Sequence, residues 1–222
     1  TLSRTIVYYE MVTVVDGRVG KAASDRRRRS IIEAALECFT TDGYEPTTVS
    51  DLRRRAHVTA GSLYHYFPGG KAEIAATVHL DCLRRYQEEF LPVLAAAGDD
   101  PEAGIRVGVR HHLEWIIAHP QRARFLFSDH PQEVAVARRE SLGELNAAFF
   151  AAVGRWIDRH ITAGAIRPLP KQALYALWVG PAQHVGRQLV TDQLRLPLED
   201  TIDVLSEGAW RALRADTSPA SA

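Results

Sequence analysis

The chain has 222 residues, of which 46% are hydrophobic and 24% charged, a balance typical of a folded protein rather than a disordered one. No apolar run approaches the roughly 18 residues of a membrane span, and no secretory leader is recognisable, so the sequence favours a soluble cytoplasmic protein without a membrane partner. The two cysteines, Cys38 and Cys82, form no CxxC pair, which excludes a disulfide scaffold and a thiolate zinc site.

The charge is balanced overall but unevenly distributed. The chain has 27 basic and 27 acidic residues, yet residues 21–71 hold nine basic against six acidic side chains. Residues 72–222 hold sixteen basic against nineteen acidic side chains. This mildly basic N-terminal part is a weak indication of an anionic partner.

Residues 1–23 differ in character from the rest of the chain. The runs Ile6–Tyr9 and Val12–Val15 are β-branched and aromatic, which predicts a flexible or extended arm. A second interpretation is that Met11 starts the native protein and that residues 1–10 lie upstream of it. Neither interpretation assigns the arm a function.

Four helices are expected next. Ser24 is a suitable N-cap for the first, which ends at Asp42-Gly43. Its apolar positions recur at helical spacing: Ile31, Ile32, Ala35, Leu36 and Phe39. A second, short helix is expected from Thr47 or Thr48, and a third from Thr59, ended by Pro68. The fourth covers about residues 71–97, with Pro92 as a kink.

The remaining sequence also has helical periodicity. Proline marks three further helix starts, at Asp100-Pro101, His119-Pro120 and His130-Pro131. Apolar periodic segments then cover about residues 132–163, 171–193 and 198–214, and residues 216–222 form a polar tail that we expect to be disordered. No segment alternates like a strand, so the sequence predicts an all-α protein.

Residues 47–67 have the pattern of a helix-turn-helix. Two short helices flank the turn Ala56–Thr59, in which Ala56 allows a close crossing, Val58 fills the gap and Thr59 caps the second helix. In this motif the N-terminal residues of the second helix enter the major groove of DNA. The small residues here suit a close approach to DNA, and three further side chains could contact phosphates or base edges. These candidates are Thr59, Ala60, Gly61 and Ser62, followed by Tyr64, His65 and Tyr66.

Together with the first helix, this segment resembles the TetR family of bacterial transcriptional repressors over about residues 25–75. The resemblance rests on Thr47-Thr48-Val49, Leu52, Ala56, Val58-Thr59, Gly61, Leu63-Tyr64, Tyr66-Phe67 and Lys71, preceded by Ile31, Ala35, Phe39 and Gly43-Tyr44. The chain departs from the family pattern at Tyr66, where histidine is usual, and in the two glycines between Pro68 and Lys71.

The resemblance implies roles for individual residues. Thr48 and Tyr64 would hold phosphates, Thr59–Ser62 would approach bases, and Lys71 would anchor a phosphate at the start of the long helix. Tyr64 could instead be a core aromatic residue. Arg26–Arg29 could contact flanking phosphates or only solubilise the chain, and Arg53–Arg55 could form a solvated helix face.

The resemblance also implies that residues 24–72 form a three-helix DNA-binding domain and residues 73–215 a larger helical domain for effector binding and dimerisation. Candidates for a ligand pocket are aromatic residues and a histidine on separate helices, each of which could equally be core. They are His112, Trp115, Phe125, Phe127, Phe149, Trp156, Tyr175 and Trp178.

Two apolar stripes near the C-terminus are the candidate interface for a homodimer. They are Leu174, Leu177, Trp178, Val185 and Leu189, then Ile202, Leu205, Ala209 and Leu213. The same stripes could be buried inside one subunit.

The sequence therefore predicts a homodimeric transcriptional repressor that binds a palindromic double-stranded DNA operator and is released by an unknown, largely apolar small molecule. Two alternatives stay open: an enzyme built on a helical bundle, and a DNA-binding protein without an effector. No catalytic motif is present, so an enzyme is not expected. His111, His112 and His119 lack acidic or cysteine partners at ligand spacing, so no metal or cofactor is expected either.

Overall fold

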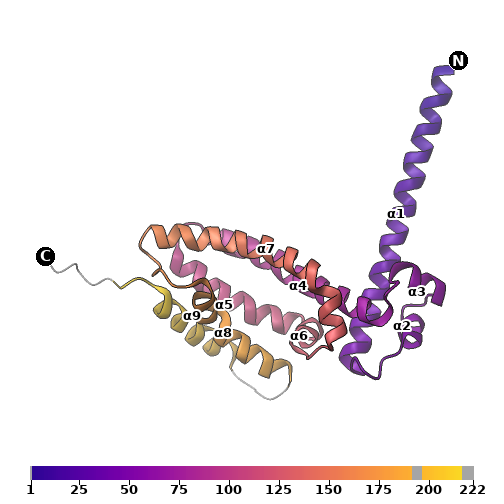
Figure 1. The fold of residues 1–222 in the computed structure, drawn as a ribbon. Helices are drawn as coiled ribbons and strands as arrows, with labels where there is room; N and C mark the ends of the chain where they lie inside the picture. The colour runs from indigo at the N-terminus through magenta and orange to yellow at the C-terminus, as the bar shows by residue number, and fades with distance from the viewer. Residues whose placement is uncertain (1, 192–196, 217–222) are drawn as a thin grey trace. The chain divides into compact units, whose positions relative to one another are not determined.

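The computed structural model describes residues 2–191 and 197–216, and within these ranges it contains nine α-helices and no β-strand (Figure 1). The helices are α1 (Leu2–Thr41), α2 (Val49–Arg55), α3 (Ala60–Tyr66), α4 (Gly70–Ala96), α5 (Pro101–Ala118), α6 (Pro120–Phe127), α7 (Gln132–Thr162), α8 (Lys171–Val190) and α9 (Leu198–Leu213). The all-α prediction is confirmed. Residues 217–222, most of the expected tail, lie outside the described residues.

The chain divides into two compact units, Thr1–Val78 and His79–Ala222. The division falls within α4, six residues beyond the boundary expected between residues 72 and 73. One continuous helix therefore supplies residues to both units.

The N-terminal arm differs from the expectation. Helix α1 begins at Leu2 and is unbroken through Ser24, so residues 2–23 are helical rather than extended and Ser24 is not a cap. Valine, isoleucine and threonine lower helix propensity by only a few tenths of a kcal/mol each, and a strand needs a partner strand to be stable. A β-branched run alone is therefore weak evidence for an extended arm.

The core of the first unit is formed by the expected apolar positions. Ile31, Ala35 and Phe39 of α1 are buried, as are Leu52 of α2 and Leu63 of α3. The two short helices thus turn their apolar side chains toward α1, and their remaining faces stay polar and exposed. This arrangement fixes α3 on the surface of the first unit.

In the second unit α5 packs against both α8 and α9, which lie side by side (Figure 1). Two glycines of α5, Gly104 and Gly108, make room for the rings of Trp156 and Trp178. The indole Nε1 of Trp178 donates a hydrogen bond to the carbonyl oxygen of Ile105, at 2.9 Å, inside the core. The large aromatic side chains therefore occupy space that small residues of α5 leave free.

Burial within the second unit corrects part of the expected dimer interface. Side chains from both apolar stripes are in the core of a single subunit, where no second subunit can reach them. These residues are Leu174, Trp178, Ile202, Ala209 and Leu213. Helical periodicity marks an apolar face but does not say whether the same chain or a second copy covers it.

None of the helices in the described ranges has the length and apolar character of a membrane span.

Replacing Gly108 with alanine should lower the free energy of unfolding by about 1–3 kcal/mol, the usual cost of overpacking. A methyl carbon at this position would lie 2.7 Å from Cζ2 of Trp178, whose ring is held by its hydrogen bond and cannot retreat. The matched control is Gly143→Ala in α7, where the added carbon meets no atom within 4 Å. Urea unfolding should show a loss for Gly108→Ala and a gain of up to about 1 kcal/mol for the control. Equal stability of the two variants would contradict the packing argument.

Candidate functional site

Helices α2 and α3 are joined by the turn expected from the sequence. Thr48 is the N-cap of α2: its hydroxyl accepts a hydrogen bond from the Asp51 backbone N–H at 3.2 Å. The Asp51 carboxylate accepts in return from the Thr48 backbone N–H at 3.0 Å. The Thr48 hydroxyl also donates to this carboxylate, and this bond, the Thr48 N–H and the nearby Arg54 guanidinium hold the pKa of Asp51 below its usual value. His57 in the turn has a φ of 54°, a left-handed conformation that redirects the chain between the helices.

The first residues of α3 form an open surface. Thr59 caps the helix by accepting a hydrogen bond from the Ser62 backbone N–H at 3.1 Å. Ala60 and Gly61 are exposed, and a Cβ added at Gly61 would meet no protein atom within 4 Å. The packing of the chain therefore does not require glycine at position 61. A close approach of the helix backbone to another molecule would explain why position 61 has no side chain.

Two of the three larger side chains proposed for DNA contact are exposed. Tyr64 is 48% exposed, so its interpretation as a core aromatic residue is wrong. His65 is exposed as well, whereas Tyr66 is half-buried and meets the His65 ring edge-on at 5.1 Å between centroids. Together with Thr59–Ser62 they place hydroxyl and imidazole groups on one short helix.

Lys71 already has protein partners. Its ammonium donates to the backbone oxygens of Tyr44 and Glu45, at 3.1 and 3.3 Å, and lies 4.2 Å from the centre of the Tyr44 ring. The side chain therefore holds the turn after α1 against the start of α4. This structural role was not predicted from the sequence, which indicated only a phosphate contact.

The arginines near the motif divide into paired and exposed groups. Arg54 pairs with Asp51, and Arg55 donates from Nε to Glu37 at 2.8 Å. Arg28 lies over the Phe67 ring at 5.1 Å, while Arg53 is exposed. Arg53, Arg54 and Arg55 are all exposed, which agrees with a solvated helix face, and pairing leaves Arg54 and Arg55 less freedom to contact phosphate.

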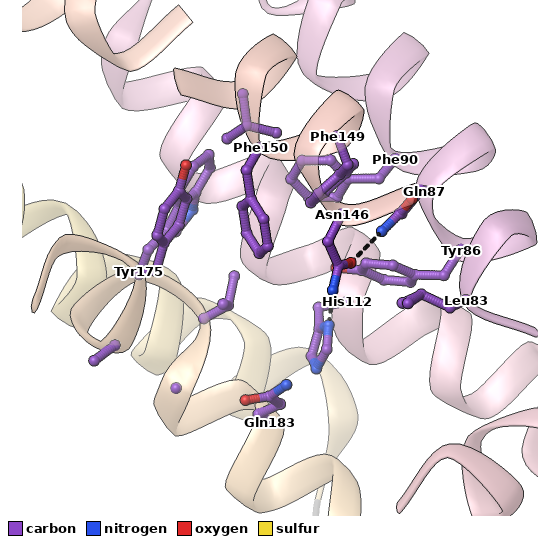
Figure 2. Close-up of a pocket in the computed structure, with 15 residues that line it drawn as sticks. Leu83, Tyr86, Gln87, Phe90, His112, Asn146, Phe149, Phe150, Tyr175 and Gln183 are labelled. Carbon is purple, nitrogen blue, oxygen red and sulfur yellow. Dashed lines mark hydrogen bonds between the residues drawn. The ribbon is translucent and has the colours of Figure 1, made fainter. Parts of the chain in front are cut away.

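The second unit contains a cavity of about 310 Å³ between α4, α5, α7 and α8 (Figure 2). Four of the expected pocket residues line it: His112, Phe149, Tyr175 and Trp178. Phe150, which is 45% exposed, lies where the cavity meets the solvent. Most of the lining is aromatic or aliphatic, and of the described lining residues none is an Asp, Glu, Lys or Arg. An apolar molecule fits this lining best.

Four polar side chains of this cavity form two hydrogen-bonded pairs. The Gln87 amide of α4 donates to Asn146 Oδ1 of α7 at 3.1 Å, and the Tyr86 hydroxyl lies 3.0 Å from His112 Nδ1 (Figure 2). Burial raises the pKa of Tyr86 and lowers that of His112 to about 4. At neutral pH, therefore, Tyr86 keeps its proton and His112 is uncharged. Because phenol is the stronger donor, we infer that Tyr86 donates to Nδ1 and that His112 Nε2 carries the ring proton.

A second cavity of about 270 Å³ adjoins the first. Two further expected residues, Trp115 and Phe127, line it. The two cavities share four lining residues: Leu83, Tyr86, His112 and Gln183. They are therefore neighbouring cavities whose shared wall includes the hydrogen-bonded Tyr86 and His112 side chains.

Two expected pocket residues line neither cavity. Phe125 is buried against the His130 ring, at 4.7 Å between centroids. Trp156 stacks on Trp178 at 5.8 Å and donates to the Gly98 carbonyl oxygen at 3.4 Å. Both are core residues, so their expected contact with a ligand is wrong. Aromatic residues at helical spacing occur in cores and in pocket walls alike, and the sequence could not separate the two.

Gln87, Asn146 and Gln183 line the first cavity but were not expected from the sequence. Gln87 is only 5% exposed although it is polar. The signal that could have found it is a glutamine in the apolar stripe of the helix between Tyr86 and Phe90. Asn146 stands between Leu145 and Ala147, and Gln183 follows Ala182, but a single polar residue in such a segment does not show which way it faces. Among the described residues there is no group of three or more metal-ligating side chains.

Known proteins share both the motif and the fold. The sequence profile described as bacterial regulatory proteins, tetR family, matches residues 31–78. The HTH-type transcriptional regulator RutR of Escherichia coli K12 is 25% identical over 174 residues, covering 76% of this chain and 77% of RutR. A TetR family transcription regulator from Marinobacter aquaeolei VT8 has a similar structure, with a TM-score of 0.69 and 17% identity, over 88% of this chain and 100% of that one. The fatty acid degradation regulator FadR from Bacillus halodurans also has a TM-score of 0.69 and 17% identity, over 83% of this chain and 94% of its own.

The chain has the DNA-binding motif and the fold of a TetR-family transcriptional regulator. The matched segment runs from α1 into the first turns of α4 and contains the exposed residues at the start of α3. Its function as a DNA-binding regulator agrees with the open surface of that helix.

The TetR-family fold of this chain should lose stability when the pH falls below about 6.5. Burial, with the Arg138 guanidinium 2.9 Å away, lowers the pKa of His79 to about 3, and burial lowers that of His112 to about 4. Below pH 6.5 these two histidines bind protons in the unfolded chain but stay unprotonated in the folded chain. Each then costs up to about 1.4 kcal/mol of stability per pH unit, and the loss continues until the pH reaches the folded pKa.

Urea unfolding at pH 7.5, 6.0 and 5.0 measures this dependence. His79→Gln, which keeps an acceptor for Arg138, should make the dependence shallower. The matched control is His184→Gln, because His184 is exposed. If His79→Gln and the wild type lose stability equally between pH 6.0 and 5.0, His79 is not a source of the acid sensitivity.

Proposed function

We propose that this regulator is a homodimeric repressor that binds a palindromic operator in the cytoplasm and leaves it when a largely apolar small molecule enters the second unit. The observation that carries the proposal is the aromatic cavity beside α4, the helix shared by both units. A regulator that only binds DNA needs no such cavity, because a packed core would be more stable.

The DNA contacts in this proposal centre on α3. Ala60, Gly61 and Ser62 would approach base edges, and Thr59, Tyr64, His65 and Tyr66 would contact phosphates or base edges. Thr48 at the start of α2 and Lys71 at the start of α4 would contribute further phosphate contacts. Because Lys71 also holds the turn after α1, its removal would disturb both the contact and the turn.

The effector would act on DNA binding through α4. This helix lines the cavity with Leu83, Tyr86, Gln87 and Phe90, and begins at Gly70 in the DNA-binding unit. A ligand that moves these side chains would shift α4 and so change the separation of the two recognition helices in the dimer. Those helices must lie about 34–36 Å apart to enter successive major grooves. Ligand and DNA then disfavour each other through one coupling free energy.

The dimer would form through the outer faces of α8 and α9. Leu177 is 37% exposed and Val204 is 70% exposed, although both are large and apolar. Pro181 and Gly208, one turn further along their helices, are exposed too. These four residues form a stripe that is separate from the buried positions of the same helices. Two copies of the stripe could build a four-helix interface with two-fold symmetry.

Replacing Val204 with glutamate should convert the dimer into monomers at micromolar concentration without unfolding them. A charge buried in an apolar interface costs several kcal/mol, whereas an exposed one costs little. Leu205→Glu is the less informative variant, because Leu205 packs against the subunit core. Light scattering measures the mass, with Val136→Glu on the exposed face of α7 as the matched control. A wild-type protein that is already monomeric would overturn the interface.

A regulator without an effector is the second candidate. One experiment separates the two: select bound fragments from a random DNA library, then measure the release of the selected DNA by apolar compounds. A repressor with an effector gives a half-site repeat with two-fold symmetry and at least one compound that releases the DNA. Symmetric sites that no compound affects would leave DNA binding in place and remove the effector.

A further inference from the structure

Two buried hydrogen-bond donors without an acceptor line the second cavity. Trp115 is 4% exposed, and its indole Nε1 has no hydrogen-bond partner. His112 Nε2, in the wall shared with the first cavity, is buried without a partner as well. A buried donor without an acceptor destabilises the folded protein. An occupant with acceptor oxygens would relieve this destabilisation at two points.

A positive charge lines the same cavity. Arg187 of α8 donates one hydrogen bond to the Phe127 carbonyl oxygen at 3.1 Å and lies 5.3 Å from the centre of the Phe127 ring. The guanidinium has five N–H donors, so others are available to an occupant. Of the described residues that line this cavity, Arg187 carries the one permanent charge and none is acidic. His79, which also lines it, is uncharged at neutral pH.

The two cavities differ in chemistry but share a wall. The first has an uncharged, mainly aromatic lining, while the second combines unpaired donors with a guanidinium. Tyr86 and His112, joined by a hydrogen bond, both belong to this wall. A molecule that occupies both cavities would therefore contact Tyr86, which belongs to α4.

We propose that the effector is amphipathic, with an apolar ring-containing body in the first cavity and a singly charged oxyanion head in the second. The head, a carboxylate or sulfonate, would accept hydrogen bonds from Arg187, Trp115 and His112. This inference rests on the proposed function and narrows its ligand class. Seating the head would add a second contact with Tyr86 of α4, from the side of the second cavity, which a neutral molecule in the first cavity does not make.

Two fluorescent probes with one ring skeleton test the proposal: N-phenyl-1-naphthylamine and its sulfonate, 8-anilinonaphthalene-1-sulfonate. The wild type should bind the sulfonate at least about tenfold more tightly than the neutral probe. Arg187→Gln should remove most of this preference, since a charge-assisted hydrogen bond is worth about tenfold in affinity. Trp115→Phe, which keeps an aromatic ring but loses the N–H, should weaken the sulfonate a few-fold. Both variants should leave neutral-probe binding within about twofold.

Matched controls are Arg139→Gln, on the exposed surface of α7, and Trp210→Phe, on α9; neither residue lines a cavity. If Arg187→Gln and Arg139→Gln weaken the sulfonate equally, Arg187 contributes only general charge and the head-group site is wrong. Equal affinity of the wild type for both probes likewise means that the second cavity holds water rather than a head group.

The failure of this inference is distinguishable from that of the proposed function. If the neutral probe binds and releases operator DNA while the sulfonate binds no more tightly, the oxyanion site is wrong. In that case the effector proposal is still supported. If neither probe binds the second unit, and no apolar compound releases DNA, both fall.

Discussion

Gly61→Glu is expected to abolish operator binding, by at least about a hundredfold in affinity, while the protein stays folded. A Cβ at position 61 meets open space, so the longer side chain does not disturb the packing of the first unit. A carboxylate near a helix N-terminus is also favourable for stability. On DNA the same carboxylate would face phosphates and the acceptors of the groove, and like charges repel. Affinity for selected and scrambled DNA, measured at two salt concentrations, gives the result.

Two companion variants make this result specific. Gly143→Glu adds the same charge on α7, where a Cβ also meets no atom within 4 Å, and should leave DNA affinity within about twofold. Tyr64→Phe removes only a hydroxyl and should weaken selected and scrambled DNA alike, because a phosphate contact carries no sequence information. A folded Gly61→Glu protein that still binds its operator would place the DNA contact elsewhere than α3.

The local elements could be predicted because short-range chemistry determines them. Thr48 and Thr59 cap their helices as expected, since a threonine hydroxyl before an apolar helical pattern satisfies free backbone N–H groups. Pro101 and Pro120 likewise stand at the first turns of α5 and α6. The start of α1 was predicted wrongly because the local sequence signals there are weak. Neither a β-branched run nor a suitable capping serine decides where a long helix begins.

The candidate site was only partly predictable because cavities depend on contacts between distant helices. Trp156 and Trp178 both stand in segments with helical apolar periodicity. Yet Trp178 lines the first cavity and Trp156 packs behind it, under Gly104. Whether an aromatic ring meets a cavity or another ring is decided by the partner helix. The sequence contains that information only through residues far along the chain.

The same limit applies to the C-terminal stripes. Leu174 and Leu177 lie three residues apart on α8, yet the first is 1% exposed and the second 37% exposed. Both fit an apolar helical period, so the pattern alone could not divide core from surface. The structure separates them because α8 turns one edge of its apolar face toward α5 and leaves the other edge uncovered.

Ala176→Trp is expected to uncouple the effector from DNA. Ala176 is exposed on α8 and lines the first cavity, so an indole there would fill space at the entrance without replacing a core residue. Trp115→Ala is a poorer choice, because Trp115 is 4% exposed and its removal would cost about 3–5 kcal/mol of stability. The matched control is Ala148→Trp, which adds the same indole at an exposed position of α7 that lines neither cavity.

The readouts are binding of N-phenyl-1-naphthylamine, its effect on the melting temperature, and its effect on operator affinity. In the wild type and in Ala148→Trp, the probe should raise the melting temperature by mass action and weaken DNA binding, since a ligand that favours one conformation disfavours the other. In Ala176→Trp the probe affinity should fall at least about tenfold, while DNA affinity without probe stays unchanged. A filled entrance thus leaves a repressor that no longer responds. If Ala176→Trp releases its operator at the same probe concentration as the control, the cavity beside α4 is not the effector site.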